Sequence, residues 1–512
     1  MQRFIFVFLH TLVTISVLIS LLTGLRIASL TRETWLFFDG LLPQGLVHFW
    51  HLFSSVLLIL CILAYPFYFF KKRRGKTRST NVKQPLSYHR SIKNLGYTLL
   101  ILACVSGLAK AFDATWLPLS LHYWVAMGVI GYLVLHSYVY FLQFGKKLLS
   151  QLWIAKQTFP LLMLLGFTVS VTWLLIPKVG NSLHQAIEVS TIPADVPITI
   201  DGIANESFWK TAPTLTVMTH SGVNFDDGST PVTIQAVHNK EESYFYFTWV
   251  DETQSLSHLP LVKTSNGWKV TENGFYQFDE KQHYEDKFAV MLSNSCQFAA
   301  DNVVHLGSSP LPNKPSNWHK KGYHASLDGH VRDLWHWKAI RTNDMMLADD
   351  NYFGAPITPR TGERRYTAGY QTDGKESGAY IMNWQWYKKD AIIPRRLPNP
   401  STKYSTEEVL PWFGSAPYQT QHDTYPLGTT LPSVLYRSNR FEGDRADVRA
   451  HAQYADGRWH LEMARKNDTH SDKDVALKSG VCLWVAAFDG AQIAHTHHMQ
   501  GIKLAYQGDK AL

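Results

Sequence analysis

HYWVAMGVIGYLVLH, residues 122–136, begins and ends on histidine, and everything between the two rings is apolar, aromatic or glycine. In an α-helix, fourteen residues turn through about 1400°, which is within about 40° of four whole turns, and rise about 21 Å. His122 and His136 are therefore expected on one helix face, at opposite depths of a lipid bilayer. Ionisable residues within membrane segments are rare and usually functional, so the two histidines predict a site on this face.

The apolar content of the chain is concentrated in its first third. The 512 residues are 46% hydrophobic, but the long apolar runs come before residue 178, and the remainder is rich in Trp, Tyr, His and turn residues. Five segments are long and apolar enough to span a membrane: 4–24, 44–70, 95–112, 119–143 and 159–177. The sequence therefore predicts a membrane domain over 1–180 and a second domain over 190–512.

Basic residues in two loops indicate the orientation of these spans. The loop after the second span contains Lys71, Lys72, Arg73, Arg74, Lys76, Arg78 and Lys83. The loop after the fourth span begins GKK at 145–147, and cytoplasmic loops carry an excess of Lys and Arg. The chain is therefore expected to be a multi-pass protein of a bacterial inner membrane, with its N-terminus in the cytoplasm and the part after Pro177 in the periplasm. Beside apolar spans, the net charge of +8 indicates topology and contact with membrane lipid, and not nucleic-acid binding.

The second domain has the pattern of short β-strands. VTIQAVH and SYFYFTWV flank a turn at Asn239–Lys240, and ADVRAHAQY and RWHLEMAR flank a turn at Asp456–Gly457, so each pair predicts a hairpin. GVCLWVAAF and IKLAY predict two more strands. Because no helix-length amphipathic pattern stands out, the domain is expected to be an all-β sandwich, with long loops over the Pro-, Gly- and Asn-rich residues 300–440.

The four cysteines form no CxxC pair, and the sequence has no CxxCH motif for covalent haem attachment. Cys61 and Cys104 fall in apolar runs and are expected to be inert core residues. Cys296 and Cys482 lie in the second domain and can form a disulfide if that domain is exported. The sequence contains no P-loop, HExxH motif or recognisable Ser–His–Asp set, so it predicts no catalytic residues.

The apolar spans carry three further histidines, His10 in the first and His48 and His51 in the second. A single histidine in a span more often contacts a neighbouring helix than binds a ligand, but depth groups this set into two levels. His10 is expected level with His136 toward the cytoplasm, and His48 and His51 level with His122 toward the periplasm. Two stacked b-type haems require this arrangement, because each iron takes one axial imidazole from each of two facing helices.

Over residues 1–145 this pattern resembles the di-haem cytochrome b subunits of formate dehydrogenases and hydrogenases. The resemblance is carried by the histidine of the first span, by HFWH in the second and by the two histidines fourteen apart in the fourth. It implies that His10 and His136 bind a haem b on the cytoplasmic side. It also implies that His51 and His122 bind a second haem b on the periplasmic side.

The second span leaves an alternative ligand open. His48 is three residues from His51 and lies on nearly the same helix face, although His51 lies deeper in the apolar run and is preferred. The resemblance further implies a core of four helices around the two haems, with the fifth helix as a tether to the second domain. Subunits of this type exchange electrons with a quinone or quinol near one haem.

Over about 195–507 the chain resembles the haem-binding domain of the ethylbenzene dehydrogenase and dimethylsulfide dehydrogenase gamma-subunit type. Four stretches carry the resemblance in order: VTIQAVHNKEESYFYFTWVD, YEDKFAVML, GYHASLDGHVRDLWHWKA and AAFDGAQIAHTHHMQGIKLAYQ. That family holds one haem b between side-chain ligands, commonly a Met and a Lys. Before DLWHWKA this chain has His324 and no Met, and the donors near its last strand are His495, His497, His498 and Lys503. His324 is therefore expected as the first ligand, with His498 or Lys503 opposite.

Together these patterns predict a membrane-bound b-type cytochrome. Two membrane haems would relay electrons between the quinone pool and a haem domain in the periplasm, which would pass them to a periplasmic redox protein. Such a chain is an electron-transfer protein of the kind that serves as the cytochrome subunit of a quinone-linked oxidoreductase. The alternatives are a membrane-anchored module that binds a carbohydrate or small ligand without a redox role, and a haem-based sensor. A binding module would purify colourless.

Overall fold

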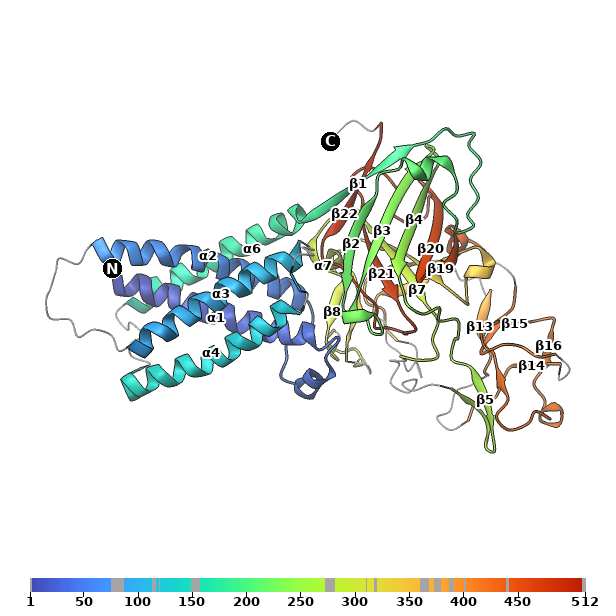
Figure 1. Cartoon of the computed structure of the whole chain (residues 1–512), viewed down its shortest axis with the longest axis horizontal. Coiled ribbons are helices and arrows are strands. Elements are labelled where there is room, and N and C mark those ends of the chain that lie inside the picture. Colours follow the sequence, from blue (N-terminus) through green and yellow to red (C-terminus); the bar gives the residue numbers. More distant parts are fainter. Residues whose placement is uncertain are drawn as a thin grey trace. The chain divides into compact units, whose positions relative to one another are not determined.

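The computed structural model describes residues 2–74, 87–112, 117–118, 120–148, 157–271, 281–309, 311–316, 320–359, 368–372, 379–385, 391–399, 402–438 and 442–508. The chain divides into two compact units, Met1–Leu183 and His184–Leu512. The first unit is helical and the second is mainly β (Figure 1). Most of the basic loop after the second span, and much of the loop after the fourth, lie outside the described residues.

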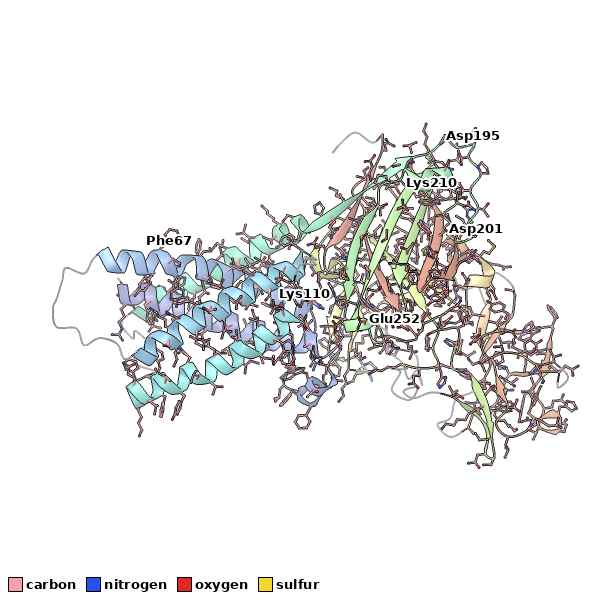
Figure 2. The ribbon with its side chains drawn as sticks, viewed as in Figure 1. Phe67, Lys110, Asp195, Asp201, Lys210 and Glu252 are labelled. Carbon is pink, nitrogen blue, oxygen red and sulfur yellow. A yellow bond between two sulfur atoms is a disulfide. The ribbon has the colours of Figure 1, made fainter. Side chains whose placement is uncertain are left out.

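Long helices make up the first unit. They are α1 Gln2–Ala28, α2 Val47–Arg74, α3 Ser87–Ala111, α4 Leu121–Phe144 and α6 Thr158–Ser182. Among the described residues five helices are long and apolar enough to cross a membrane, and they confirm the five predicted spans. Large apolar side chains face outward from the bundle, as Phe67 does with 76% of its surface exposed (Figure 2), because a membrane helix is surrounded by lipid. The chain is therefore a multi-pass membrane protein.

Two apolar clusters hold the helices of the first unit together. Helices α1, α2 and α6 form one cluster, which consists of Leu12, Phe53, Leu57, Cys61 and Ile176. Helices α1, α2 and α4 form the other, which is centred on Val17, Leu58 and Val129. Between α1 and α2 the hydroxyls of Ser20 and Ser54 form a hydrogen bond of 2.7 Å, a polar contact of the kind that stabilises helix packing in membranes.

One large sheet organises the second unit. In spatial order its strands are β12 Tyr370–Thr372, β11 Asp349–Phe353, β10 Arg332–Lys338, β7 Lys287–Ser293, β21 Cys482–Phe488, β22 Gly501–Tyr506, β1 His184–Thr191, β3 Ser229–His238, β4 Glu242–Val250, β20 Arg458–Lys466 and β19 Arg449–Ala455. Strand β2, Leu215–His220, pairs with β3. Strand β1 runs parallel to both β22 and β3 and so connects the two halves of the sheet.

The two halves of this sheet face each other (Figure 1). Aromatic side chains form the core between them. The ring centroid of Phe245 on β4 lies 5.6 Å from that of Trp335 on β10. The ring centroid of Phe247 on β4 lies 5.0 Å from that of Phe288 on β7. Trp249 of β4 stacks on Phe288 at 4.6 Å. Since β4 and β7 are far apart in the order of the sheet, these contacts show that the sheet folds over on itself. The predicted all-β sandwich is confirmed.

The predicted hairpins are present. Strands β3 and β4 pair antiparallel, as do β19 and β20. Lys240 (φ 77°), Asp456 (φ 52°) and Gly457 (φ 72°) take the left-handed conformation that tight hairpin turns require. GVCLWVAAF and IKLAY form β21 and β22, as expected.

Residues 300–440 were expected to be long loops, and this expectation was partly wrong. Strands β10, β11 and β12 from this region belong to the large sheet. Small sheets within it are formed by β8 Val304–Leu306, β9 Gly322–His324, β13 Tyr380–Met382, β14 Arg396–Pro398, β15 Leu410–Pro411, β16 Ser415–Pro417 and β18 Val434–Tyr436. Strand β17 Thr430–Leu431 pairs with β5 Leu261–Thr264, which pairs with β6 Gly267–Val270. Strands of two or three residues are too short to show an alternating pattern, so composition hid them.

Short helical turns complete the described chain. They are η1 Glu33–Phe38, η2 Gly145–Lys147, η4 Ser207–Lys210, η5 Asp226–Gly228, α7 Phe298–Asp301, η7 Asn343–Met345, η8 Thr420–His422 and η9 Asp444–Ala446. None of these segments has the length of an amphipathic helix, in agreement with the sequence pattern of the second domain.

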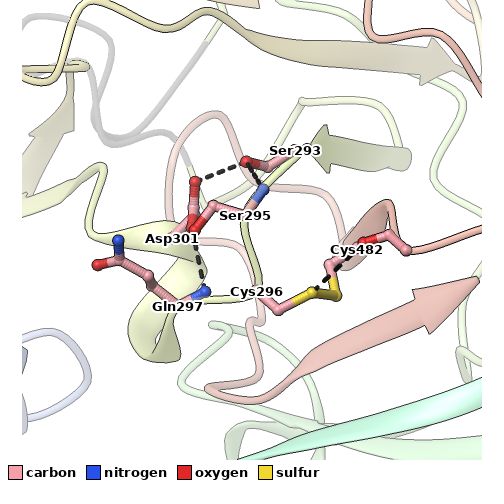
Figure 3. The surroundings of a disulfide bond; sticks show 7 residues. Ser293, Ser295, Cys296, Gln297, Asp301 and Cys482 are labelled. Carbon is pink, nitrogen blue, oxygen red and sulfur yellow. Dashed lines mark hydrogen bonds between the residues drawn. A yellow bond between two sulfur atoms is a disulfide. The ribbon is translucent and has the colours of Figure 1, made fainter. Parts of the chain in front are cut away.

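Cys296 and Cys482 form a disulfide in the second unit (Figure 3). Their Cα atoms are 5.4 Å apart, and the residues are 186 positions apart in sequence. The turn that carries Cys296 is held by Asp301, whose carboxylate accepts hydrogen bonds from the Ser293 hydroxyl at 2.6 Å and from the backbone N–H of Gln297 at 3.1 Å. The disulfide therefore fastens the start of β21 to an ordered turn that follows β7.

Candidate functional site

The first unit brings its membrane histidines together in two pairs. The ring of His10 on α1 lies beside that of His136 on α4, with 6.3 Å between centroids and 41° between planes. The ring of His51 on α2 lies beside that of His122 on α4, with 6.2 Å and 85°. These are the pairs expected from depth in the sequence. His48 is buried one turn earlier on α2, and the ring beside His122 is that of His51.

The separation within each pair suits two imidazoles on opposite sides of one metal ion. A metal lies about 2 Å from an imidazole nitrogen, and the ring centre lies about 1 Å beyond that nitrogen, so two rings on opposite sides of one ion have centroids about 6 Å apart. The distances of 6.3 Å and 6.2 Å agree with this value. Facing pairs of helices in a bundle are a common place for such cofactor sites.

Hydroxyl groups contact the Nδ1 atom of three of these four rings. The contacts are His51 with Thr23 at 2.9 Å, His122 with Ser106 at 3.0 Å and His136 with Tyr132 at 3.1 Å. Each contact occupies Nδ1 and leaves Nε2 as the nitrogen that can face a metal. Histidines that bind metals usually form such a hydrogen bond through their other ring nitrogen. Sequence analysis did not identify Thr23, Ser106 and Tyr132, because hydroxyl side chains are common in membrane helices.

The second unit contains a third pair with nearly the same separation. His324, at the end of β9, and His495, between β21 and β22, have ring centroids 6.1 Å apart and planes 24° apart. His324 stacks on Phe353 at 4.5 Å, and His495 lies 4.8 Å from Phe488. Burial lowers the pKa of His324 to about 3, with a smaller effect of its histidine neighbours, and burial also lowers the pKa of His495. Both imidazoles are therefore neutral at pH 7, which is the form that binds a metal.

One hydrogen bond determines the tautomer of His495. Its Nδ1 atom lies 2.7 Å from the backbone carbonyl oxygen of Thr496. Because a carbonyl oxygen only accepts hydrogen bonds, Nδ1 carries the proton and Nε2 has a free lone pair. In the described part of the chain, the buried Nδ1 atom of His324 has no hydrogen-bond partner. Within the third pair, hydrogen bonding through Nδ1 therefore holds the ring of His495 and not that of His324.

The third pair lies against the outer face of the sheet, away from the aromatic core. Side chains alternate along the strands, so that Val290 of β7 belongs to the core while Met291 belongs to an apolar layer on the opposite face. The buried residues of this outer layer are Ala289, Met291, Val303, Leu334, Phe353, Cys482, Trp484 and Phe488. Both histidines contact phenylalanines of this layer, and the side chains of His336 and Lys287 lie against the same Phe488 ring.

The structure places the ring of His495 beside His324, and the expected ligands His498 and Lys503 have other surroundings. His498 is buried, and its Nε2 accepts a hydrogen bond of 2.9 Å from the backbone N–H of Val485. Lys503 is exposed on β22. The segment that holds His495 and His498 is irregular, so no period in the sequence indicates which of its histidines faces His324.

Buried carboxylates form a separate cluster in the second unit. Single oxygens of Asp251, Asp286 and Asp489 all lie within 4.8 Å of one another. Burial, reinforced by Asp489, raises the pKa of Asp251 to about 7, and burial raises the pKa of Asp489 to about 6. The pKa of Asp286 is also well above its ordinary value, because it is buried and lies near Asp251. Asp251 and Asp489 therefore take up protons near neutral pH.

Several solved structures are similar to part of the chain. Two are of a family 9 carbohydrate-binding module from Caldicellulosiruptor kristjanssonii, one with glucose and one with cellotriose. Each is 9% identical to this chain, covers 64% of it and has a TM-score of 0.23. The match covers 99% of the glucose-bound chain and 97% of the cellotriose-bound chain. A putative carbohydrate-binding protein from Bacteroides uniformis is 7% identical over 64% of this chain and 94% of its own, with a TM-score of 0.24. No curated protein matches the chain.

A family model described as ethylbenzene dehydrogenase matches residues 206–500. This stretch is longer than half of the 512 residues and contains both His324 and His495. The five membrane helices precede it in the chain. The chain therefore belongs to the ethylbenzene dehydrogenase family.

Proposed function

We propose that this chain is a membrane-bound b-type cytochrome that relays electrons between the quinone pool and a periplasmic redox protein. The observation that carries the proposal is the recurrence of one spacing, 6.3, 6.2 and 6.1 Å, in three histidine pairs of the described chain. A haem b bound at each pair would supply a one-electron carrier with two axial nitrogen ligands. The residues that would hold the three haems are His10 with His136, His51 with His122 and His324 with His495.

The position of the first two pairs supports a relay through the membrane. His122 and His136 are fourteen residues apart on α4, so their two pairs are separated by about 21 Å along the helix axis. The hydrocarbon core of a bilayer is about 30 Å thick, and two carriers at this separation would cover most of it. Quinone is the natural membrane-soluble partner for such a relay.

The third pair differs in ligand type from the Met and Lys that are common in the family. His324 occupies the place of the Met, and His495 supplies a second imidazole in place of the Lys. Imidazole is a regular axial ligand of haem iron. Two imidazole ligands predict a six-coordinate low-spin spectrum without a methionine–iron absorption band.

We propose that the second unit lies in the periplasm. The odd number of spans and the basic loops after the second and fourth spans support this orientation. The Cys296–Cys482 disulfide supports it as well, because disulfides persist in the oxidising periplasm and are rare in the cytoplasm.

Haem content of the purified full-length protein tests the proposal. We expect three haems b per chain in a pyridine haemochrome assay and a low-spin reduced-minus-oxidised spectrum. Reduction by a quinol analogue in proteoliposomes tests the electron-transfer role. A well-folded protein that stays colourless after incubation with haem would overturn the proposal and would favour a membrane-anchored ligand-binding module instead.

A further inference from the structure

Two dipeptides flank the His51–His122 pair in the same way. Thr23–Gly24 on α1 meets His51, and Ser106–Gly107 on α3 meets His122. In each case the hydroxyl oxygen lies beside Nδ1, at 2.9 Å for Thr23 and 3.0 Å for Ser106. In each case the following glycine lies against the same ring, where an added Cβ would be 3.3 Å from Cε1 of His51 and 3.1 Å from Cε1 of His122.

The protons of both hydroxyls are already engaged. Thr23 Oγ1 donates to the backbone carbonyl of Ile19 at 2.6 Å, and Ser106 Oγ donates to that of Ala103 at 3.2 Å. A hydroxyl has one proton to donate, so toward the imidazole each of these oxygens can only accept. Nδ1 of both rings must therefore carry a proton, and Nε2 of both rings has a free lone pair.

The glycines make these contacts possible. At 3.1 to 3.3 Å a Cβ would be closer to the ring than in most real Cβ contacts, so an alanine at either position would require the imidazole to shift by a few tenths of an ångström. Glycine lets the helix backbone approach the ring until the neighbouring hydroxyl reaches Nδ1. Each dipeptide thus fixes both the position and the tautomer of one histidine.

The His10–His136 pair is held differently. His136 Nδ1 contacts the Tyr132 hydroxyl at 3.1 Å, one turn away on the same helix. The ring of His10 stacks on Phe6 at 5.5 Å, and no hydrogen bond to this ring is present among the described residues. Of the histidine pairs in the described residues, His51–His122 is the one with a hydroxyl acceptor from another helix on each of its two rings.

We propose that Thr23–Gly24 and Ser106–Gly107 are positioning elements that hold His51 and His122 with Nε2 toward one shared iron and that lower the reduction potential of this site. The proposal rests on the proposed function for the identity of the ligand as haem. An Nδ1–H group that donates to an acceptor increases the basicity of Nε2. A more basic ligand stabilises ferric iron more than ferrous iron, so the potential falls.

Hydroxyl-deletion variants of the full-length protein test this inference. Thr23→Val and Ser106→Ala remove the two hydroxyl acceptors and leave the backbone carbonyls of Ser20 and Ala103 near the rings, and Thr23→Ser restores one hydroxyl. Ser20→Ala is the matched control, because it removes a hydroxyl of the same helix that contacts Ser54 and no histidine ring. The measurements are haem content and a potentiometric titration of the membrane haems.

In T23V and S106A we expect one membrane haem to shift to a more positive midpoint, with a several-fold change in its ferric-to-ferrous ratio at fixed potential. T23S should return to the wild-type midpoint, and S20A should not move it. Loss of one haem from T23V but not from T23S would also support the positioning role. If T23V does not accumulate, S106A on the other helix carries the same test.

The outcomes separate this inference from the proposed function. Haem-loaded T23V and S106A proteins with wild-type midpoints would overturn the positioning role and leave the cytochrome assignment intact. A wild-type protein without membrane haem would overturn the cytochrome assignment itself.

Discussion

The histidine pairs of the two units reach the same spacing by different means. In the first unit the paired rings come from long helices, and side-chain hydroxyls such as Thr23 and Ser106 hold them. In the second unit one ring comes from a three-residue strand and the other from an irregular segment, and the backbone carbonyl of Thr496 holds the latter. A helix in lipid fixes the direction of each side chain through its period, whereas in the sandwich the path of connecting segments decides which side chains meet.

The two kinds of pair also differ in what surrounds them. Both rings of the third pair lie on phenylalanines of the outer apolar layer, and one pair member has no hydrogen bond to its buried Nδ1 in the described chain. We therefore expect the His51–His122 pair, in which each ring contacts a hydroxyl, to be the most rigidly defined of the three sites. Substitutions of neighbouring residues should disturb the third pair more easily.

The largest expected effect is the loss of whole haems from one unit while the other keeps its own. His122→Ala should remove one membrane haem, His136→Ala the other, and His324→Ala only the haem of the second unit, because each iron loses an axial ligand. A haemochrome assay should then give about two haems per chain in each variant instead of about three. Both membrane variants retaining all haems with unchanged spectra would contradict the assignment of two separate membrane sites.

The second test concerns the location of the two units, because the proposal places the first unit in the membrane and the second unit in the periplasm. Alkaline phosphatase fused after Gly180 should be active, and the same enzyme fused after Gly75 should be inactive. Phosphatase activity normalised to fusion-protein abundance is the measurement. The reverse pattern would show that the spans have the opposite orientation, and inactivity of both fusions would show that the number of spans between Gly75 and Gly180 is even.

A matched pair of variants sharpens the account of the third pair. His495→Ala should convert the haem of the second unit to a high-spin form or release it, since Nε2 of His495 is the nitrogen whose lone pair is free to bind iron. His498→Ala should keep the low-spin spectrum and cost about 1–3 kcal/mol of stability, because it leaves the buried Val485 N–H without its acceptor. Spectra and thermal unfolding distinguish the two. A spectral loss in His498→Ala alone would return the ligand role to the residue expected from sequence.

A further expected effect concerns the pH dependence of the second unit. The pKa of Asp251 is about 7 in the folded state, well above its ordinary value, because the carboxyl is buried beside Asp489. A folded state that holds this proton more tightly is favoured at low pH. The contribution of Asp251 to the free energy of unfolding is therefore fully present below about pH 4 and is lost as the pH rises to about 7. The slope is about 1.4 kcal/mol per pH unit for one such group. Asp251→Asn should flatten the dependence of denaturant midpoint on pH over this window, and an unchanged slope would contradict the account.

Helix periodicity made most of the membrane site predictable. The two histidines of α4 were expected on one face, and the depth of His10 and of His51 in their spans indicated which partner each would meet. Sequence left His48 as an alternative to His51, since residues three apart lie on nearly the same face. The bundle resolved this, because the ring beside His122 is that of His51.

In the second unit the alternating pattern predicted the hairpins and the sandwich but not the site. Strand β11 was missed within a region of loop-like composition. His324 was singled out by its place before DLWHWKA, but its neighbour was expected to be His498 or Lys503 and is His495. Three residues of irregular backbone turn His498 toward Val485 and His495 toward His324, and no local propensity encodes that turn.

The sequence by itself determined the number of spans, the pairing by depth of the membrane histidines and the all-β character of the second unit. These follow from the length and period of apolar segments, which are local properties of the chain. Only the tertiary structure decided that Thr23 and Ser106 meet the Nδ1 atoms of histidines on other helices, that Cys296 pairs with Cys482 and that His495 lies beside His324. Each of these contacts joins residues from separate elements, so it depends on how those elements pack and not on the sequence around either partner.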